Sequence, residues 1–359
     1  MGEGKIPFNE SEMSVQRERF CFGYMRNVLN TPVTPRENLR RALAGDAVWM
    51  PTTYDYHYLF PLCMPDNKAK GNVSDAKLPP EEYGGPDMFG IVWEYEPNIG
   101  GSTVRPGNPT LAKAGEWREK ITFPTKEVID SWDWEGCYKN ADVENERDFY
   151  WELVICTGWF ERLISFMDFE GAAIAMVDPD QKDDVKELFE ALADLYIMLI
   201  DKYVEVFPET ADAVTLHDDW GHQRGQFFSQ DVVREMLAPS MKRVVDHIHE
   251  LGMDAEFHSC GKVEGLVPCM IEIGFQMHEC QDIMDFDTVV PQYGDKILFH
   301  VPQDTPSYDA PDEEQRAAAR AFAERLIAWG NPVILDDYYA PNPVNNVFQD
   351  ELYRLIREA

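Results

Sequence analysis

The chain has 359 residues, of which 44% are hydrophobic, and a formal net charge of −33 from 65 acidic and 32 basic residues. This hydrophobic fraction supports a large buried core, while the negative charge disfavours nucleic acid, anionic membranes and highly phosphorylated substrates as partners. The sequence has no apolar run of membrane-spanning length, no apolar signal segment at its start, and an odd number of cysteines, seven, that favours reduced thiols. We therefore expect a cytoplasmic protein without membrane or nucleic-acid contacts.

The first half of the chain contains one well-marked helix and three strand candidates. Residues 1–33 lack a clear pattern and are interpreted as an N-terminal extension. The segment TPRENLRRALAG (34–45) predicts a helix, with Thr34 as cap, Pro35 at the first helical position, Glu37 at the capping-box position and Gly45 at the end. The segments DAVWMP (46–51), FGIVWEY (89–95) and WELVICT (151–157) read as strands.

The second half alternates strands and helices more regularly. The predicted strands are 211–220, 254–261, 275–281, 296–304 and 331–339, and the predicted helices are 181–207, 229–252, 263–274 and 312–330. In the helix 229–252, Ser229 is the expected cap, Gly252 the stop and Pro239 a point of splitting or kinking. The helix 181–207 carries an apolar stripe that we assign to the core: Val185, Leu188, Phe189, Leu192, Tyr196 and Leu199.

Eight predicted strands with intervening helices favour an α/β fold, a (β/α)8 TIM barrel that spans residues 34–359. Active sites of such barrels lie at the carboxyl ends of the strands. Here those ends are rich in ligand-type residues, namely His217, Asp218, Asp219, His258, Cys260, His278, Glu279, Cys280, His300, Asp336 and Asp337. We therefore expect a functional barrel mouth.

These segments also carry a family resemblance. HDDWGHQRGQFFSQDVVREMLAPSMKRVVDHIHELG, HSCGKVEGLVPCMIEIGF and YGDKILFH resemble the uroporphyrinogen decarboxylase superfamily, and TPRENLRRALAGDAVWMP and DMFGIVW fit its N-terminal half. The resemblance implies a (β/α)8 barrel. It also implies either a decarboxylase or a cobalamin-dependent methyltransferase.

One branch of the superfamily, the methyltransferase component of corrinoid-dependent O-demethylases, binds zinc through two glutamates and a histidine. Glu264, Glu279 and His300 match its pattern, with fourteen residues between the first two and twenty between the last two. The resemblance implies Zn²⁺ bound by these residues. It further implies transfer of methyl from an aromatic methyl ether, vanillate-, veratrole- or guaiacol-like, to a corrinoid (cobalamin). Because the chain shows no corrinoid-binding domain, a separate corrinoid protein of this anaerobic pathway would carry that cofactor.

Competing functions remain open. The thiol-methylating branch binds zinc through His-x-Cys and a later Cys; His258 and Cys260 match the first part, but no cysteine follows Cys280. These two residues are therefore reserve ligands. The decarboxylase branch carries an arginine-rich segment where VWMPTTYDYHYLFPLCMP has no arginine, so a decarboxylase here would be a metal-free enzyme for a smaller acid. A barrel that only binds an aromatic ligand or a corrinoid protein is the non-enzymatic possibility, and a homodimer is compatible with each of these functions.

Two further sets of residues are candidates for the same chemistry. The candidate proton donors near the rim are His217, Asp218, Asp219 and His222. The candidate aromatic pocket for an ether substrate consists of Trp49, Tyr54, Tyr56, His57, Tyr58 and Trp159, for which ordinary core packing is the equal alternative.

Overall fold

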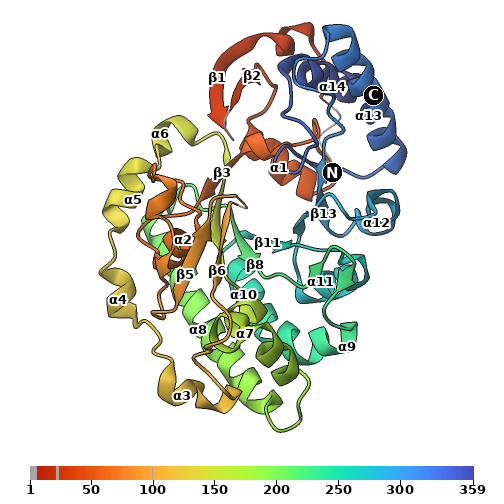
Figure 1. The fold of residues 1–359 in the computed structure, drawn as a ribbon. Coiled ribbons are helices and arrows are strands. Elements are labelled where there is room, and N and C mark those ends of the chain that lie inside the picture. Colours follow the sequence, from red (N-terminus) through yellow and green to blue (C-terminus); the bar gives the residue numbers. More distant parts are fainter. Residues whose placement is uncertain (1–5, 22–23, 99) are drawn as a thin grey trace. The chain divides into compact units, whose positions relative to one another are not determined.

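The computed structural model describes the chain except for residues 1–5, 22–23 and 99 (Figure 1). Its contacts divide the chain into two units. Unit 1 consists of Met1–His57, Asp148–Tyr150 and Gln276–Ala359, and unit 2 of Tyr58–Arg147 and Trp151–Phe275. Both units contain parallel strands that alternate with helices, so the chain has the α/β fold of TIM-barrel type that the sequence predicts.

Unit 2 is built on the parallel strands β7 (Tyr150–Ile155), β8 (Ala213–His217) and β11 (Asp254–Ser259). Their register pairs Ile155 with Leu216 and, at the carboxyl end, His217 with His258. Each strand is almost wholly buried, as expected for parallel strands covered by helices. The carboxyl ends of β8 and β11 therefore bring two histidines side by side.

Helices α7 (Trp159–Ala175), α8 (Lys182–Val206) and α10 (Ala238–Glu250) lie together in unit 2 (Figure 1), where α8 contacts both α7 and α10, and α10 contacts β11. The predicted stripe of α8 is confirmed, because all six of its residues are fully buried. The expected break at Pro239 is also confirmed. The predicted single helix is divided into a short helix α9 (Gln230–Val232), capped by Ser229, a π-helical turn η5 (Val233–Leu237), and α10, which has Pro239 in its first turn.

One predicted barrel strand of unit 2 is wrong. Residues 89–95 contribute instead to β5 (Val92–Glu96), which pairs antiparallel with β4 (Gly85–Pro86) and β6 (Gly101–Val104). Its alternation of exposed and buried residues fits a small sheet with one solvated face. The helix α2 (Pro65–Lys70) packs on this small sheet. Unit 2 also contains the short helices α3 (Trp117–Lys120), α4 (Lys126–Asp130), α5 (Trp134–Asn140) and α6 (Val143–Glu146), and α11 (Val267–Ile273) follows β11.

Unit 1 is built on the parallel strands β12 (Met277–Cys280), β13 (Leu298–Pro302) and β14 (Ile334–Asp336). Its helices are α1 (Pro35–Leu43), α12 (Phe286–Tyr293), α13 (Asp312–Trp329) and α14 (Asn346–Glu358). Thr34 caps α1 as predicted, by accepting a hydrogen bond from the Glu37 amide. The predicted strand 46–51 is wrong: these residues form no strand, and only Thr52 bridges to Leu335. The strand that forms nearby, β3 (Tyr56–Leu59), was not predicted.

The described residues of the predicted N-terminal extension belong to unit 1 and form regular structure. A 3-10 turn, η1 (Glu10–Met13), precedes the antiparallel hairpin of β1 (Val15–Cys21) and β2 (Tyr24–Leu29). Glu12 accepts hydrogen bonds from Tyr353 and Arg357 of α14, so the two ends of the chain are joined by a buried ion pair. The boundary at residue 33 stays a prediction.

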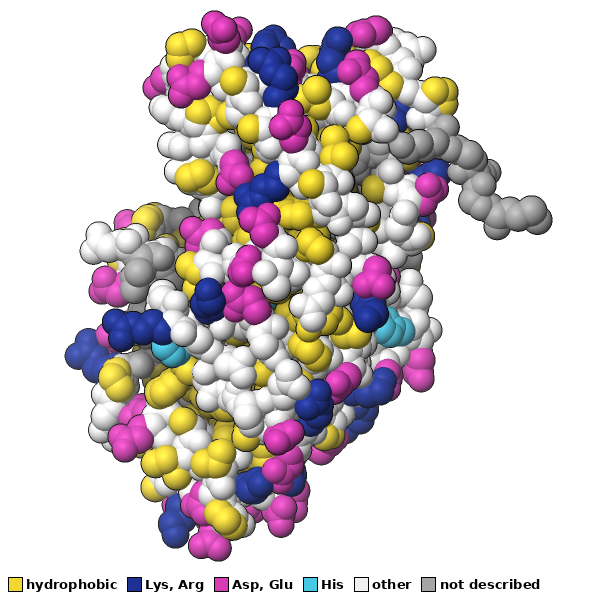
Figure 2. Space-filling view, turned by 90° about the vertical axis from the view of Figure 1, so that its right-hand side faces the viewer, with side chains coloured by type: hydrophobic (Ala, Val, Ile, Leu, Met, Phe, Trp, Pro, Cys, Tyr) yellow, Lys and Arg dark blue, Asp and Glu magenta, His cyan; other side chains and the backbone are white. Residues whose placement is uncertain are grey.

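The surface carries many charges of both signs. On the face drawn in Figure 2, acidic and basic side chains lie next to one another, consistent with exposed ion pairs such as Arg325 with Asp287. No helix in the described part of the chain is long and apolar enough to cross a membrane.

Candidate functional site

The site is centred on two histidines at the carboxyl ends of neighbouring strands of unit 2. His217 ends β8 and His258 lies near the end of β11, and their rings stack with centroids 4.1 Å apart and planes 9° apart. Asp219 follows two residues after His217. Among the residues that the structure describes, His217, Asp219 and His258 form the group whose possible metal-ligand atoms all lie within 4.8 Å of one another.

A cysteine lies at the edge of this group. The Cys260 sulfur is 3.5 Å from Nε2 of His258, and the Cys260 amide donates a 2.7 Å hydrogen bond to Oδ1 of Asp219. That oxygen is 3.9 Å from Nε2 of His258. Burial raises the pKa of the Cys260 thiol, so a free thiolate is disfavoured there without a cation.

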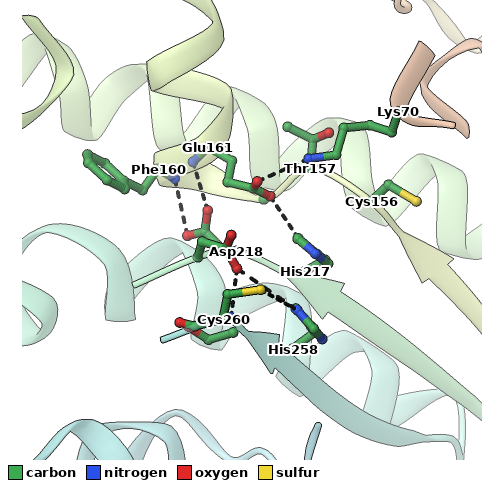
Figure 3. Close-up of polar contacts among 12 residues, drawn as sticks. Lys70, Cys156, Thr157, Phe160, Glu161, His217, Asp218, His258 and Cys260 are labelled. Carbon is green, nitrogen blue, oxygen red and sulfur yellow. Dashed lines mark hydrogen bonds and ion pairs between the residues drawn. The ribbon is translucent and has the colours of Figure 1, made fainter. Parts of the chain in front are cut away.

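A pair of charged residues orients His217. Oε2 of Glu161, at the start of α7, lies 2.7 Å from Nδ1 of His217, and Oε1 accepts a 3.0 Å hydrogen bond from the Lys70 ammonium (Figure 3). Burial on its own would raise the pKa of Glu161, but the charge of Lys70 and the hydrogen bond with His217 lower it to about 2. An ionised Glu161 fixes the proton of His217 on Nδ1, which leaves Nε2 as the lone-pair atom.

Asp218 braces the strand end. Its carboxylate accepts hydrogen bonds from the amides of Phe160 and Glu161 and from the indole of Trp220, at 2.9 to 3.1 Å. Burial raises the pKa of Asp218 to about 7. The helix start can approach this closely because residue 158 is glycine: a Cβ there would lie 2.5 Å from Cβ of Asp218. Asp218 thus joins α7 to β8 and holds Glu161 in place.

The donor set suits a divalent metal. Two imidazoles and a carboxylate, with one further position open, match the ligand types of catalytic zinc sites. The carboxylate that holds the second nitrogen of His217 is the usual outer partner of a metal-binding histidine. The hydroxyl of Thr157, two residues after the end of β7, is buried and has no hydrogen-bond partner among the described residues, so a polar ligand would also find a donor there.

The metal ligands predicted from the sequence lie in both units. Glu264 belongs to unit 2, in the turn η6 (Glu264–Leu266), with its carboxylate 3.6 Å from the Lys262 ammonium. Glu279 and His300 lie on β12 and β13 of unit 1, and both act electrostatically on Asp336, whose pKa burial raises to about 6. The set of Glu264, Glu279 and His300 stays a prediction.

Two of the four candidate proton donors, His217 and Asp219, are members of the metal-ligand group, and Asp218 is the brace beside it. His222 is the exposed residue of β9 (Gly221–His222), where its ring stacks on Phe227 and accepts a hydrogen bond from the Arg224 amide.

The candidate pocket residues are also divided between the units. Trp49, Tyr54, Tyr56 and His57 belong to unit 1, and Tyr58 and Trp159 to unit 2. Trp159 is fully buried and its indole donates to the Phe189 carbonyl, and Trp49 packs on Tyr353 and Leu29. These two tryptophans have the contacts of core residues. A role for the six residues in substrate binding stays a prediction.

Sequence reasoning missed Glu161 and Lys70. Glu161 had a usable signal, because it is a charged residue in the apolar segment CTGWFERL directly after a predicted strand. Lys70 had none, since it lies on a six-residue helix that the sequence does not mark and reaches the site only through the tertiary fold.

Comparison with known proteins supports the fold assignment. No protein-family model and no curated protein matches the chain. Among solved structures, a methyltransferase from Methanosarcina mazei is similar with a TM-score of 0.57 and 13% identity over 90% of this chain and 98% of that one. An intracellular xylanase from Thermoanaerobacterium saccharolyticum matches more weakly, with a TM-score of 0.34 and 7% identity over 64% of this chain and 81% of that one. At 13% identity the first likeness establishes a shared barrel fold.

Proposed function

We propose that this protein is a zinc-dependent methyltransferase that moves the methyl group of an aromatic methyl ether to the Co(I) corrinoid of a separate corrinoid protein. The observation that carries the proposal is the convergence of His217, Asp219 and His258 at the carboxyl ends of β8 and β11. That edge is where barrels of this type carry out chemistry. The resemblance of the sequence to the corrinoid-dependent methyltransferases supplies the reaction class.

Zinc bound at such a site supplies a Lewis acid for the ether oxygen, which must leave as a phenolate. The residues of this chain hold and orient that site. Glu161 and Lys70 keep His217 in one tautomer, and the Cys260 amide fixes one oxygen of Asp219. The small and largely neutral substrate also agrees with the strongly acidic chain, which would repel a polyanion.

The proposal has two candidate donor sets for the metal. The first is the compact group of His217, Asp219 and His258, with Cys260 beside it. The second is the set that the resemblance implies, Glu264, Glu279 and His300. Both offer imidazole and carboxylate ligands suited to zinc, and alanine variants separate them.

The test measures bound metal and methyl transfer on the same preparations. Protein purified without chelator is analysed for zinc, and transfer from a methoxybenzene to a reduced corrinoid protein is followed by the change in the corrinoid spectrum. We expect about one zinc per chain. Zinc-free protein, or zinc-loaded protein that methylates no corrinoid acceptor, would overturn the proposal.

Substitutions then assign the ligands. If the compact group binds zinc, His217→Ala and His258→Ala lose the metal, whereas Glu264→Ala and Glu279→Ala keep it. The reverse outcome assigns the metal to the second set. Asp231→Ala is the matched control, because the Asp231 side chain is 97% exposed on α9 of unit 2.

A second candidate function is methylation of a thiol, favoured by the 3.5 Å separation between the Cys260 sulfur and Nε2 of His258. In that case the thiolate of Cys260 would be a zinc ligand, and Cys260→Ser would lose both zinc and methyl transfer to a small thiol. Retention of zinc and of ether demethylation in Cys260→Ser would reject this candidate.

A further inference from the structure

Unit 1 contains a buried arginine whose charge has no direct partner. Arg26 lies on β2 and is 2% exposed, yet none of its three guanidinium nitrogens has a hydrogen-bond partner among the described residues. The guanidinium carbon lies 4.9 Å from the centroid of the Tyr54 ring. A cation–π contact offsets a small part of the cost of burying a charge, and five donors remain unused.

Asp337 interacts electrostatically with Arg26 but forms its hydrogen bonds with other residues. Oδ1 of Asp337 accepts a 2.6 Å hydrogen bond from the Gln303 side-chain amide, and Oδ2 accepts a 3.1 Å hydrogen bond from the Thr53 hydroxyl. Burial raises the pKa of Asp337 well above its usual range, which favours the neutral acid. The positive charge of Arg26 is therefore left largely uncompensated within unit 1.

A cavity lies against this arginine. It has a volume of about 200 Å³ and is lined by Arg26, Tyr24, Tyr54, Asp337, Tyr338 and Asn342, with two prolines beside them. This is space for several water molecules, at roughly 30 Å³ each. A second, smaller cavity of about 70 Å³ shares Arg26 and Tyr54 as a common wall. The larger one combines a buried cation with aromatic and proline walls.

We propose that this cavity binds the carboxylate of a small aromatic acid, held by the guanidinium of Arg26. The planar guanidinium pairs with a carboxylate through two parallel hydrogen bonds, and the ring of the ligand would pack against the tyrosines and prolines of the wall. A monoanion suits the site better than phosphate, because Arg26 is the one cation among the residues that line the cavity and balances a single negative charge.

The inference concerns a cavity whose lining residues all belong to unit 1. The aromatic carboxylate has two sources. It is either the carboxylated form of the ether substrate, an assignment that rests on the proposed function, or a free aromatic acid that binds without being methylated or demethylated. The binding site itself depends on neither.

Calorimetric titration of the full chain tests the site, with benzoate as the charged probe and benzamide as its neutral match of nearly equal shape. We expect benzoate to bind and benzamide not to bind. Arg26→Met should abolish benzoate binding, and Arg26→Lys, which keeps the charge without the fork, should weaken it by about tenfold or more. Arg320→Met, at an arginine of α13 with a 50% exposed side chain, should bind benzoate like the natural protein.

Equal binding of benzoate by Arg26→Met, or equal binding of benzamide, would overturn the proposal. Thermal unfolding of each variant shows that a lost titration signal comes from folded protein. We expect Arg26→Met to fold, because removing an unpaired buried charge relieves a desolvation cost.

Kinetics distinguish the two sources. If the carboxylate belongs to the substrate, benzoate competes with 3,4-dimethoxybenzoate in the methyl-transfer assay. If it belongs to a separate acid, benzoate binds without competing. Failure to observe any methyl transfer would reject the proposed function while leaving the calorimetric result on Arg26 intact.

Discussion

Two buried polar networks of unit 2 are built by the same two helices and differ in how completely they are satisfied. In the first, Arg162 of α7 forms ion pairs with Asp66 of α2 and with Asp87, all almost inaccessible to solvent. In the second, Glu161, the preceding residue of α7, joins Lys70 of α2 to His217. Consecutive residues at one helix start thus enter networks of different kinds.

The first network is closed at its two carboxylates, and only Nε of Arg162 lacks a hydrogen-bond partner within it. Asp87 also accepts hydrogen bonds from the Trp93 indole and from backbone amides, and Asp66 accepts one from the Met88 amide. The second network is open, because it ends in His217, Asp219 and His258, whose possible ligand atoms lie close to one another. A closed network of buried charges holds a fold together, whereas an open one can bind a cation.

The largest expected effect falls on the closed network. Arg162→Met leaves Asp66 and Asp87 without their counter-charge and should lower the free energy of unfolding by about 3 to 5 kcal/mol. Urea denaturation measures this loss, while zinc per folded chain should stay unchanged. Arg118→Met, at an exposed ion pair with Asp184, is the control and should cost at most about 1 kcal/mol. A loss of zinc with little loss of stability would reverse the roles of the two networks.

Removing a ligand from the open network should have the opposite signature. His258→Ala should weaken zinc binding by more than the roughly 10- to 100-fold cost of losing an outer partner, because it removes a donor atom. Competition with a chelator of known affinity measures the change. His249→Ala, on the exposed face of α10, serves as the control. Undiminished zinc affinity in His258→Ala would contradict the compact group and favour Glu264, Glu279 and His300 as the ligands.

An intermediate effect on zinc affinity is expected for Glu161 of α7, which joins Lys70 of α2 to His217. Glu161→Gln keeps the shape of the side chain but removes the charge that holds His217, and zinc affinity should fall about 10- to 100-fold. Glu187→Gln, at a glutamate of α8 with a 62% exposed side chain, should leave it unchanged. An unaffected Glu161→Gln would mean that His217 needs no orienting charge.

The smallest effect is a pH dependence of the metal-free protein. Burial acts to raise the pKa of Glu161, but Lys70 and His217 lower this pKa to about 2, from an ordinary value of 4.5. Because the folded pKa is the lower one, the native state binds fewer protons, and the contribution of Glu161 to stability is present above pH 4.5 and lost as the pH falls toward 2. The difference in free energy of unfolding between the natural protein and Glu161→Gln should therefore shrink over that interval. A difference that stays constant with pH would contradict the depressed pKa.

Much of the fold followed from local pattern. Six of the eight predicted strands form as parallel strands, and the stripe of α8, the caps at Thr34 and Ser229 and the break at Pro239 are confirmed. The two failures, 46–51 and 89–95, share a cause. Both are short apolar runs, and such runs do not reveal whether a segment pairs in the main sheet, in a small antiparallel sheet or not at all.

The sequence by itself determined the fold class and the polar strand ends, because hydrophobic periodicity and cap residues act over a few neighbouring positions. It also placed His217, Asp219 and His258 among the candidate site residues. Only the tertiary structure grouped them, since the in-register pairing of β8 with β11 stacks the two imidazoles. The same holds for Lys70, Glu161 and Arg26. Whether a charged side chain is paired, orienting or left without a partner depends on residues far away in the chain, and burial then sets the energetic consequence.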